Sequence, residues 1–241
     1  MRFDIVTIFP RMIEAFLAEG VVGRAVARGV LEVAVHNLRD FTVDRHRSVD
    51  DVPYGGGPGM VMKPEPLMLA VDTIRREWGS PRAVILASPQ GKQLSHATAA
   101  RLSRLSHLVI LCGRYEGVDE RVCEYVASEE LSIGDYVLSG GELPAAVIVD
   151  VIARHVPGVV GNDDSVEGDS FARNLLDCPH YTRPTVVDRH RVPDVLLSGN
   201  HAAIRRWRKR EAIRRTLKRR PDLLTGAILD DEEQEFLREF E

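Results

Sequence analysis

Three short apolar segments, each ending in a polar turn that contains glycine, constrain the fold of this chain most strongly. Residues 83–91 (AVILASPQG), 108–117 (LVILCGRYEG) and 132–141 (SIGDYVLSGG) share this pattern. Continuous apolar runs of this length are typical of strands buried on both faces of a parallel sheet. We therefore predict strands over the leading parts of these segments, namely 83–87, 108–112 and 132–138.

The elements around these strands follow an alternating strand–helix order. Residues 3–9 form a β-rich run that stops at Pro10, and 30–35 alternate weakly like a second strand. Apolar spacing predicts a helix over 11–29, with Gly20 and Gly29 as breaks. Further helices are predicted over 64–78, 95–105 and 143–156. This order favours an α/β fold in which a parallel sheet is joined by crossover helices.

The three glycine turns predict a ligand site. In open parallel sheets, ligands bind beyond the carboxyl ends of the strands, where these turns would converge. Ordinary strand–helix turns are the alternative interpretation. No GxGxxG opens a helix after these strands, and no GxxxxGK[ST] is present, so a dinucleotide or nucleoside triphosphate site is disfavoured.

A long polar segment, 40–60, contains the glycine-rich run 54–60 (YGGGPGM). A loop of about twenty residues within a domain is usually functional or disordered. The sequence leaves two interpretations open, a flexible surface loop or a basic, mobile loop that contacts a polyanion.

Bulk properties are those of a globular chain. It has 241 residues, a formal net charge of −4 and three cysteines without a CxxC pair, which favours reduced thiols in a cytoplasmic protein. The first nine residues contain an acid and resemble a strand, so no signal peptide is expected. No apolar run approaches the ~20 residues that span a bilayer, so no membrane association is expected.

The C-terminal part segregates its charge. Residues 201–220 carry ten Arg or Lys against one acid, Glu211, whereas 222–241 carry eight acids and one Arg. The basic stretch, with Trp207 among its charges, favours nucleic-acid contact over a merely solvated face. The acidic, Gly/Ser-rich residues 161–174 are expected to form a linker. The helix 143–156 is apolar almost all round, which suggests packing against a second subunit.

Together these segments resemble the bacterial tRNA (guanine-N1-)-methyltransferases, a family of the SPOUT class that uses S-adenosyl-L-methionine. The resemblance spans nearly the whole chain. It rests on residues 54–60 (YGGGPGM), 88–91 (SPQG), 111–117 (LCGRYEG), 131–144 (LSIGDYVLSGGELP), 176–184 (LDCPHYTRP) and 196–208 (LLSGNHAAIRRWR).

The resemblance implies a fold and a division into domains. Residues 1–160 would form a SPOUT-type α/β domain with a C-terminal trefoil knot, which binds S-adenosylmethionine. Residues 161–176 would be a flexible linker with a catalytic Asp, and 177–241 a small all-helical domain that binds tRNA. Such proteins are homodimers with active sites at the subunit interface.

The resemblance also implies site residues. The three turns would hold the cofactor in a bent shape, through Ser88, Pro89, Gly113, Tyr115, Glu116, Ile133, Gly134, Asp135, Tyr136, Val137, Leu138, Gly140 and Gly141. Within the basic stretch, the residues expected to bind tRNA are Arg205, Arg208, Arg214, Arg215 and Arg219.

The implied reaction methylates N1 of the guanosine immediately 3′ of the tRNA anticodon. Neutral guanine carries a proton on N1, so a general base is needed, and negative charge then develops mainly on O6. By resemblance Asp169 is the base and Arg154 the cation. No metal is needed to activate the methyl group, and the resemblance allows Mg²⁺ without indicating its ligands. A helper acid that often precedes the base is replaced here by Gly168, with Glu167 one position earlier.

Two alternatives remain at this point. A SPOUT enzyme could instead methylate the ribose 2′-oxygen, and the basic helix alone would fit an RNA-binding module without catalytic activity.

Overall fold

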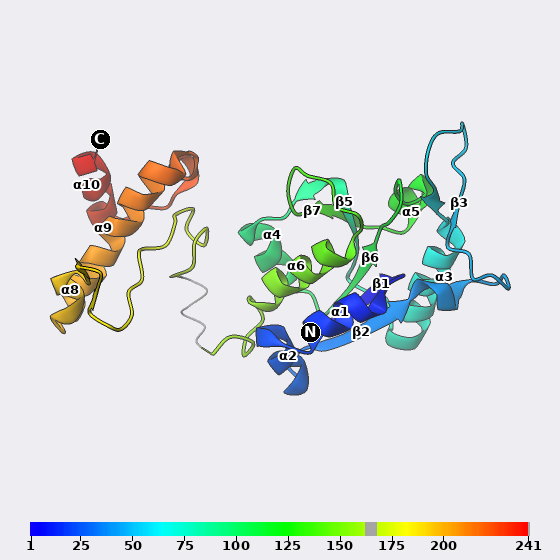
Figure 1. Cartoon of the computed structure of the whole chain (residues 1–241), viewed down its shortest axis with the longest axis horizontal. Helices are drawn as coiled ribbons and strands as arrows, with labels where there is room; N and C mark the ends of the chain where they lie inside the picture. Colours follow the sequence, from blue (N-terminus) through cyan, green and yellow to red (C-terminus); the bar gives the residue numbers. More distant parts are fainter. Residues whose placement is uncertain (162–167, 241) are drawn as a thin grey trace. The chain divides into compact units, whose positions relative to one another are not determined.

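The computed structural model describes residues 1–161 and 168–240. The chain divides into two compact units, Met1–Asn162 and Asp163–Glu241 (Figure 1). Among the described residues, no helix is both long enough and apolar enough to span a membrane.

A parallel sheet forms the centre of the first unit. Its five strands among the described residues run in the order β2-β1-β6-β5-β7, and every neighbouring pair is parallel. The predicted parallel α/β architecture is therefore confirmed. The strands are β1 (Arg2–Thr7), β2 (Glu32–Asn37), β5 (Ala83–Gln93), β6 (His107–Cys112) and β7 (Glu129–Ser132).

Helices cover both faces of this sheet. The helices of the first unit are α1 (Pro10–Leu17), α2 (Gly20–Ala27), α3 (Pro64–Trp78), α4 (His96–Leu102), α5 (Glu120–Tyr125), α6 (Glu142–Ala153) and the 3₁₀ turn η1 (Leu38–Phe41). Helices α1, α2, α4 and α6 share one buried apolar cluster with Ile85 and Ile110 of the sheet. Helices α3 and α5 and η1 share the other with Leu86 and Val109. Successive strand residues thus enter opposite cores, which explains why β5 and β6 begin as continuous apolar runs.

The third predicted strand is wrong in its bounds. β7 covers Glu129–Ser132 rather than 132–138. The Ser132 hydroxyl donates to the Gly134 carbonyl and accepts from the Gly134 amide, which turns the backbone out of the sheet. Tyr136 and Val137 are then exposed, so the apolar residues that suggested a strand lie in a loop.

The first predicted strand–turn also differs in detail. β5 continues to Gln93, and its register against β7 shifts between Ala87 and Lys92, both of which pair with Leu131. Residues 88–91 therefore bulge out of a longer strand instead of ending it.

The long polar segment is ordered by a short ladder. β3 (Asp50–Asp51) pairs antiparallel with β4 (Val61–Met62), and the glycines between them have positive φ. Met62 also forms a parallel bridge to Val118. The segment is thus attached to the turn that follows β6.

The second unit is built around α9 (His201–Arg219), whose cap is the Asn200 side chain. Its small core joins Leu175, Ile213 and Phe236. The unit also contains β8 (Val186–Val187), β9 (His190–Arg191), α8 (Asp194–Leu197), η2 (Pro221–Gly226) and α10 (Asp231–Phe240). β8 and β9 pair as an antiparallel ladder, so the described part of this unit is not all helical as expected.

Candidate cofactor pocket and catalytic residues

A cavity of about 730 Å³, counted with its open mouth, lies at the bulge of β5 and beyond the carboxyl ends of β6 and β7. The three predicted glycine turns all line it, so their convergence is confirmed. The predicted residues on its wall are Ser88, Pro89, Gly113, Tyr115, Glu116, Ile133, Gly134, Tyr136, Val137, Leu138, Gly140 and Gly141. Asp135 lies on the same turn but is not part of the wall.

The second turn is supported by the polar segment. The Glu116 amide donates to the Met60 carbonyl at 2.9 Å, and the Met62 amide donates to the Gly117 carbonyl at 2.9 Å. A side chain at position 59 would collide with the Glu116 carboxylate, so glycine is required there. The glycine-rich run therefore helps to shape one wall of the pocket.

Tyr115 occupies a strained position on this turn. Its φ of 62° lies in the left-handed region, which few non-glycine residues adopt. Burial raises the pKa of its hydroxyl, and the charge of Asp50 and a hydrogen bond to it act in the same direction, against Arg39. The hydroxyl therefore stays neutral and is hydrogen-bonded to Asp50 of β3.

The third turn lies directly against the second. The Gly141 amide donates to the Gly113 carbonyl at 2.8 Å. A Cβ at position 141 would lie 2.7 Å from the Cys112 Cα, so no side chain fits between these backbones. Two adjacent glycines thus let the third turn close one side of the pocket.

Sequence reasoning missed several wall residues, among them Arg114, Val118, Ser132 and Pro144. Each lies inside or beside a motif that was already identified. Its place in that motif could therefore have indicated that it lines the pocket. Arg114 is the most informative, because its side chain pairs with buried Glu142.

The two predicted catalytic residues belong to different units. Arg154 is the C-cap of α6 in the first unit, and Asp169 lies in the second. Both side chains are half-buried and both engage in interactions within the chain. Their assignment as cation and base stays a prediction.

The basic helix α9 is partly neutralised by the acidic C-terminal segment. Lys209 Nζ lies 2.6 Å from Asp230 and 3.2 Å from Glu232. Arg210 pairs with Glu239 at 3.2 Å. Arg206 pairs with Glu232 in the same way, and its guanidinium also lies over the Phe236 ring.

The arginines predicted to bind tRNA lie elsewhere on α9. Arg205, Arg208 and Arg219 are exposed and form no ion pair with any described residue. Arg214 pairs with Glu211, and Arg215 donates to the Asp177 carbonyl at 3.5 Å. Three of the five predicted residues therefore carry positive charge that no described acid pairs with.

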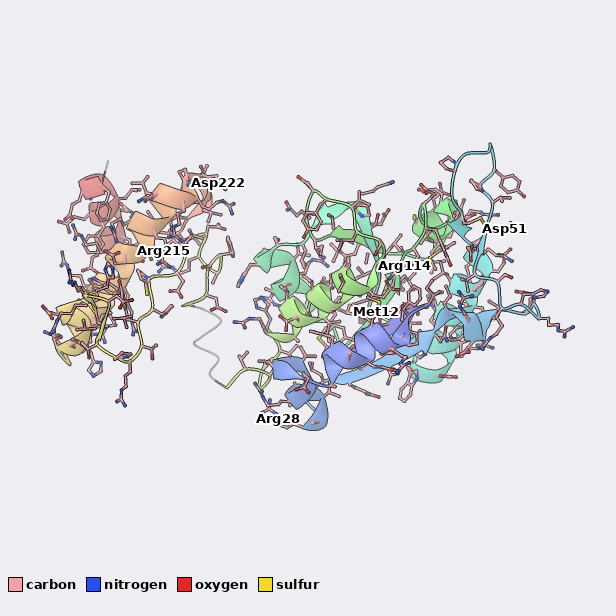
Figure 2. All side chains as sticks on the ribbon, viewed as in Figure 1. Met12, Arg28, Asp51, Arg114, Arg215 and Asp222 are labelled. Carbon is pink, nitrogen blue, oxygen red and sulfur yellow. The ribbon has the colours of Figure 1, made fainter. Side chains whose placement is uncertain are left out.

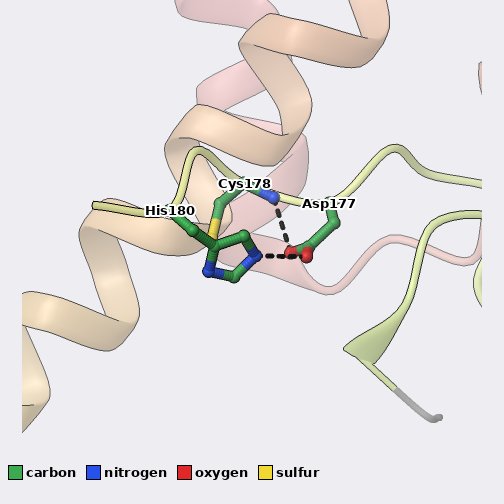
Figure 3. A group of neighbouring side chains, drawn as sticks. All are labelled: Asp177, Cys178 and His180. Atoms are coloured by element: carbon green, nitrogen blue, oxygen red, sulfur yellow. Dashed lines mark hydrogen bonds and ion pairs between the residues drawn. The ribbon is translucent and has the colours of Figure 1, made fainter. Parts of the chain in front are cut away.

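In the described part of the chain, one group brings three metal-ligand side chains together. Donor atoms of Asp177, Cys178 and His180 lie within 4.8 Å of one another (Figure 3). The Asp177 carboxylate already binds His180 Nε2 and the Cys178 amide, each at 2.6 Å. Burial, followed by the charge of Asp177, raises the pKa of the Cys178 thiol to about 11. The contacts within the group are those of a local turn, in which the Asp177 carboxylate holds the Cys178 amide and the His180 ring.

The parallel sheet with a pocket at its carboxyl ends defines an α/β protein of the class that binds a small ligand there. A model of the family described as tRNA (Guanine-1)-methyltransferase TrmD matches residues 1–226. The chain belongs to this family, which confirms the resemblance seen in its motifs.

Individual relatives are similar in sequence to this chain along almost its whole length. The tRNA (guanine-N(1)-)-methyltransferase of Aromatoleum aromaticum is 54% identical over 243 residues, covering 99% of this chain and 92% of the relative. The protein of the same name from Geobacter metallireducens is 50% identical over 241 residues, covering 100% and 98%. That of Pseudomonas putida W619 is 52% identical over 240 residues, covering 100% and 96%.

Proposed function

We propose that this chain is an enzyme that transfers a methyl group from S-adenosylmethionine to N1 of the guanosine immediately 3′ of the tRNA anticodon. The observation that carries this proposal is the family match over residues 1–226, in a chain whose three glycine turns converge on one pocket. No observation favours ribose methylation or a non-enzymatic module.

The pocket suits the cofactor in its lining. The wall combines apolar side chains such as Ile133 and Leu138 with backbone groups left open by Gly140 and Gly141. We assign the lining residues of the three turns to the adenosine and methionine parts of S-adenosylmethionine.

The chain's own residues would handle the proton and the charge of the target base. Asp169 accepts the N1 proton, which makes the N1 lone pair available for bonding to carbon. Arg154 stabilises the negative charge that develops on O6. S-adenosylmethionine would be held by the three pocket turns and would supply a methyl group on its sulfonium, whose sulfur would keep the electrons of the carbon–sulfur bond on transfer.

The second unit would bind the RNA. Arg205, Arg208 and Arg219 carry exposed positive charge suited to phosphate contacts, and Arg214 and Arg215 extend the same helix. We place a knotted cofactor-binding domain in residues 1–160, the linker in 161–176 and the tRNA-binding domain in 177–241.

We further propose a cytoplasmic homodimer with active sites at the subunit interface. Leu143 and Val147 of α6 are 56% and 40% exposed, although the helix is strongly apolar. A second subunit on this face would bury them. Among the described residues, no group of three carboxylates comes together, and we assign no ligands to Mg²⁺.

Nucleoside mapping tests the proposed reaction. The purified chain is incubated with S-adenosylmethionine and a tRNA transcript, and the digested product is separated by mass spectrometry. We expect 1-methylguanosine as the methylated nucleoside. A 2′-O-methylated nucleoside would contradict the proposal, and so would a complete lack of methyl transfer to any tRNA.

A further inference from the structure

A buried ion pair joins the second pocket turn to the first residue of α6. Arg114 Nε and Nη2 each lie 2.9 Å from Oε2 of Glu142. The Glu142 side chain is 1% exposed and that of Arg114 is 16% exposed. Moving two charges out of water costs free energy. We therefore take this buried pair to fix a specific geometry that apolar packing alone would not specify.

Glu142 also links this pair to the end of the neighbouring strand. Its Oε1 accepts a hydrogen bond from the Thr7 hydroxyl at 2.7 Å, and that hydroxyl accepts one from the Phe9 amide at 2.9 Å. Thr7 is the last residue of β1 and is fully buried. The carboxylate therefore fixes the start of α6 against the carboxyl end of the sheet.

Arg114 fixes the third pocket turn with its remaining groups. Nη1 donates to the Ser139 carbonyl at 3.1 Å, and the backbone at Arg114 forms an antiparallel bridge with Gly140. A Cβ at position 140 would collide with the Arg114 guanidinium, so the arginine packs flat against that glycine. Figure 2 shows Arg114 beside Met12 of α1, whose sulfur lies 3.8 Å from Nη2.

We propose that Arg114 and Glu142 are a positioning pair for the methyl donor. Arg114 acts through residues 139–141, which it holds over the pocket, and Glu142 keeps the guanidinium in place. The proposal rests on the proposed function, because it takes the pocket to be the S-adenosylmethionine site. It adds two residues outside the predicted set, one of which is on the pocket wall.

The test is calorimetric titration of the full chain with S-adenosylmethionine. Arg114→Met keeps the length of the side chain and removes its charge and hydrogen bonds, and Glu142→Gln keeps the shape and removes only the charge. We expect Arg114→Met to raise the dissociation constant by roughly tenfold or more and Glu142→Gln by a smaller factor. Arg121→Met is the matched control, since its ion pair with Asp119 is exposed and off the pocket wall.

The outcomes separate positioning from simple loss of fold. If the variants only destabilise the protein, the bound stoichiometry falls while the dissociation constant of the folded fraction stays the same, and that result would overturn the inference. Wild-type affinity in both variants would also overturn it. If Arg114→Met does not fold, Glu142→Gln alone decides. Failure of the wild-type chain to bind S-adenosylmethionine, even with tRNA present, would instead overturn the proposed function.

Discussion

The amide of Gly141 donates to the carbonyl of Gly113 at 2.8 Å, so the third pocket turn is bonded directly to the second. The two turns follow β7 and β6, which are not neighbours in the sheet because β5 lies between them. The contact is therefore made above the strand ends, where the pocket lies. The contact requires the two backbones to approach so closely that no side chain fits between them.

We expect Gly141→Ala to abolish binding of S-adenosylmethionine. The new Cβ would lie 2.7 Å from the Cys112 Cα and 2.8 Å from the Gly113 nitrogen, so one turn must move. Gly161→Ala is the control, because a Cβ there meets no atom within 4 Å. Calorimetry measures both variants, and equal affinities for the two would show that the contact between the turns is not needed for binding.

Asp169→Asn should lower the rate of methyl transfer by about 10²–10⁴-fold, the usual contribution of a general base. Its dissociation constant for S-adenosylmethionine should stay unchanged, because Asp169 is not among the residues that line the pocket. Single-turnover kinetics with saturating tRNA measures the chemical step. Near-normal turnover would show that another group removes the N1 proton.

The two kinds of arginine on α9 should differ in their effect on tRNA binding. Changing exposed Arg205 and Arg219 to Gln should weaken tRNA binding. It should also reduce the slope of the logarithm of the binding constant against the logarithm of the salt concentration by about one per lost phosphate contact. Changing Arg206 and Arg210 to Gln should leave the slope nearly unchanged, because acids of the C-terminal segment already neutralise them. Binding measured at several salt concentrations distinguishes the pairs, and equal slopes for both would contradict the assignment.

A buried carboxylate in β1 should make stability depend on pH. Burial raises the pKa of Asp4, but hydrogen bonds from His36, Arg2 and His107 outweigh it and lower the pKa from 3.8 to about 2. A lowered pKa in the folded state contributes stability above the unfolded value, and this is lost as pH falls through the folded value. We expect the free energy of unfolding to drop by about 2 kcal/mol between pH 4 and pH 2 from this group.

Urea unfolding at several pH values measures this loss. Asp4→Asn cannot titrate at this position, so its free energy of unfolding should be lower at pH 5 and should change less between pH 4 and pH 2. Parallel pH profiles for the variant and the wild-type chain would show that other carboxylates dominate acid unfolding.

The sequence predicted the sheet best where the strands are buried on both faces. β6 after His107 and the start of β5 are apolar, and both were predicted closely. β7 begins with Glu129 and Glu130, so its pattern gave no strand signal, and the apolar residues after Ser132 suggested a strand where the structure has a loop. Helix α10 lies in the segment that the resemblance implied to be helical, but its acids obscured the apolar spacing of Phe236 and its neighbours, so the residue pattern alone did not predict it.

The pocket was predictable because topology forces the carboxyl ends of parallel strands to one edge. The Arg114–Glu142 pair was not, since its members are 28 residues apart and meet only through tertiary packing. The roles of Arg154 and Asp169 came from family resemblance, because no local spacing connects residues in two separate units.

One comparison of two RNA substrates tests the central claim most directly. Methyl transfer from S-adenosylmethionine is measured with a tRNA transcript that carries guanosine immediately 3′ of the anticodon and with a transcript that carries adenosine there. We predict rapid incorporation into the first and none into the second. Equal incorporation into both transcripts would contradict the account.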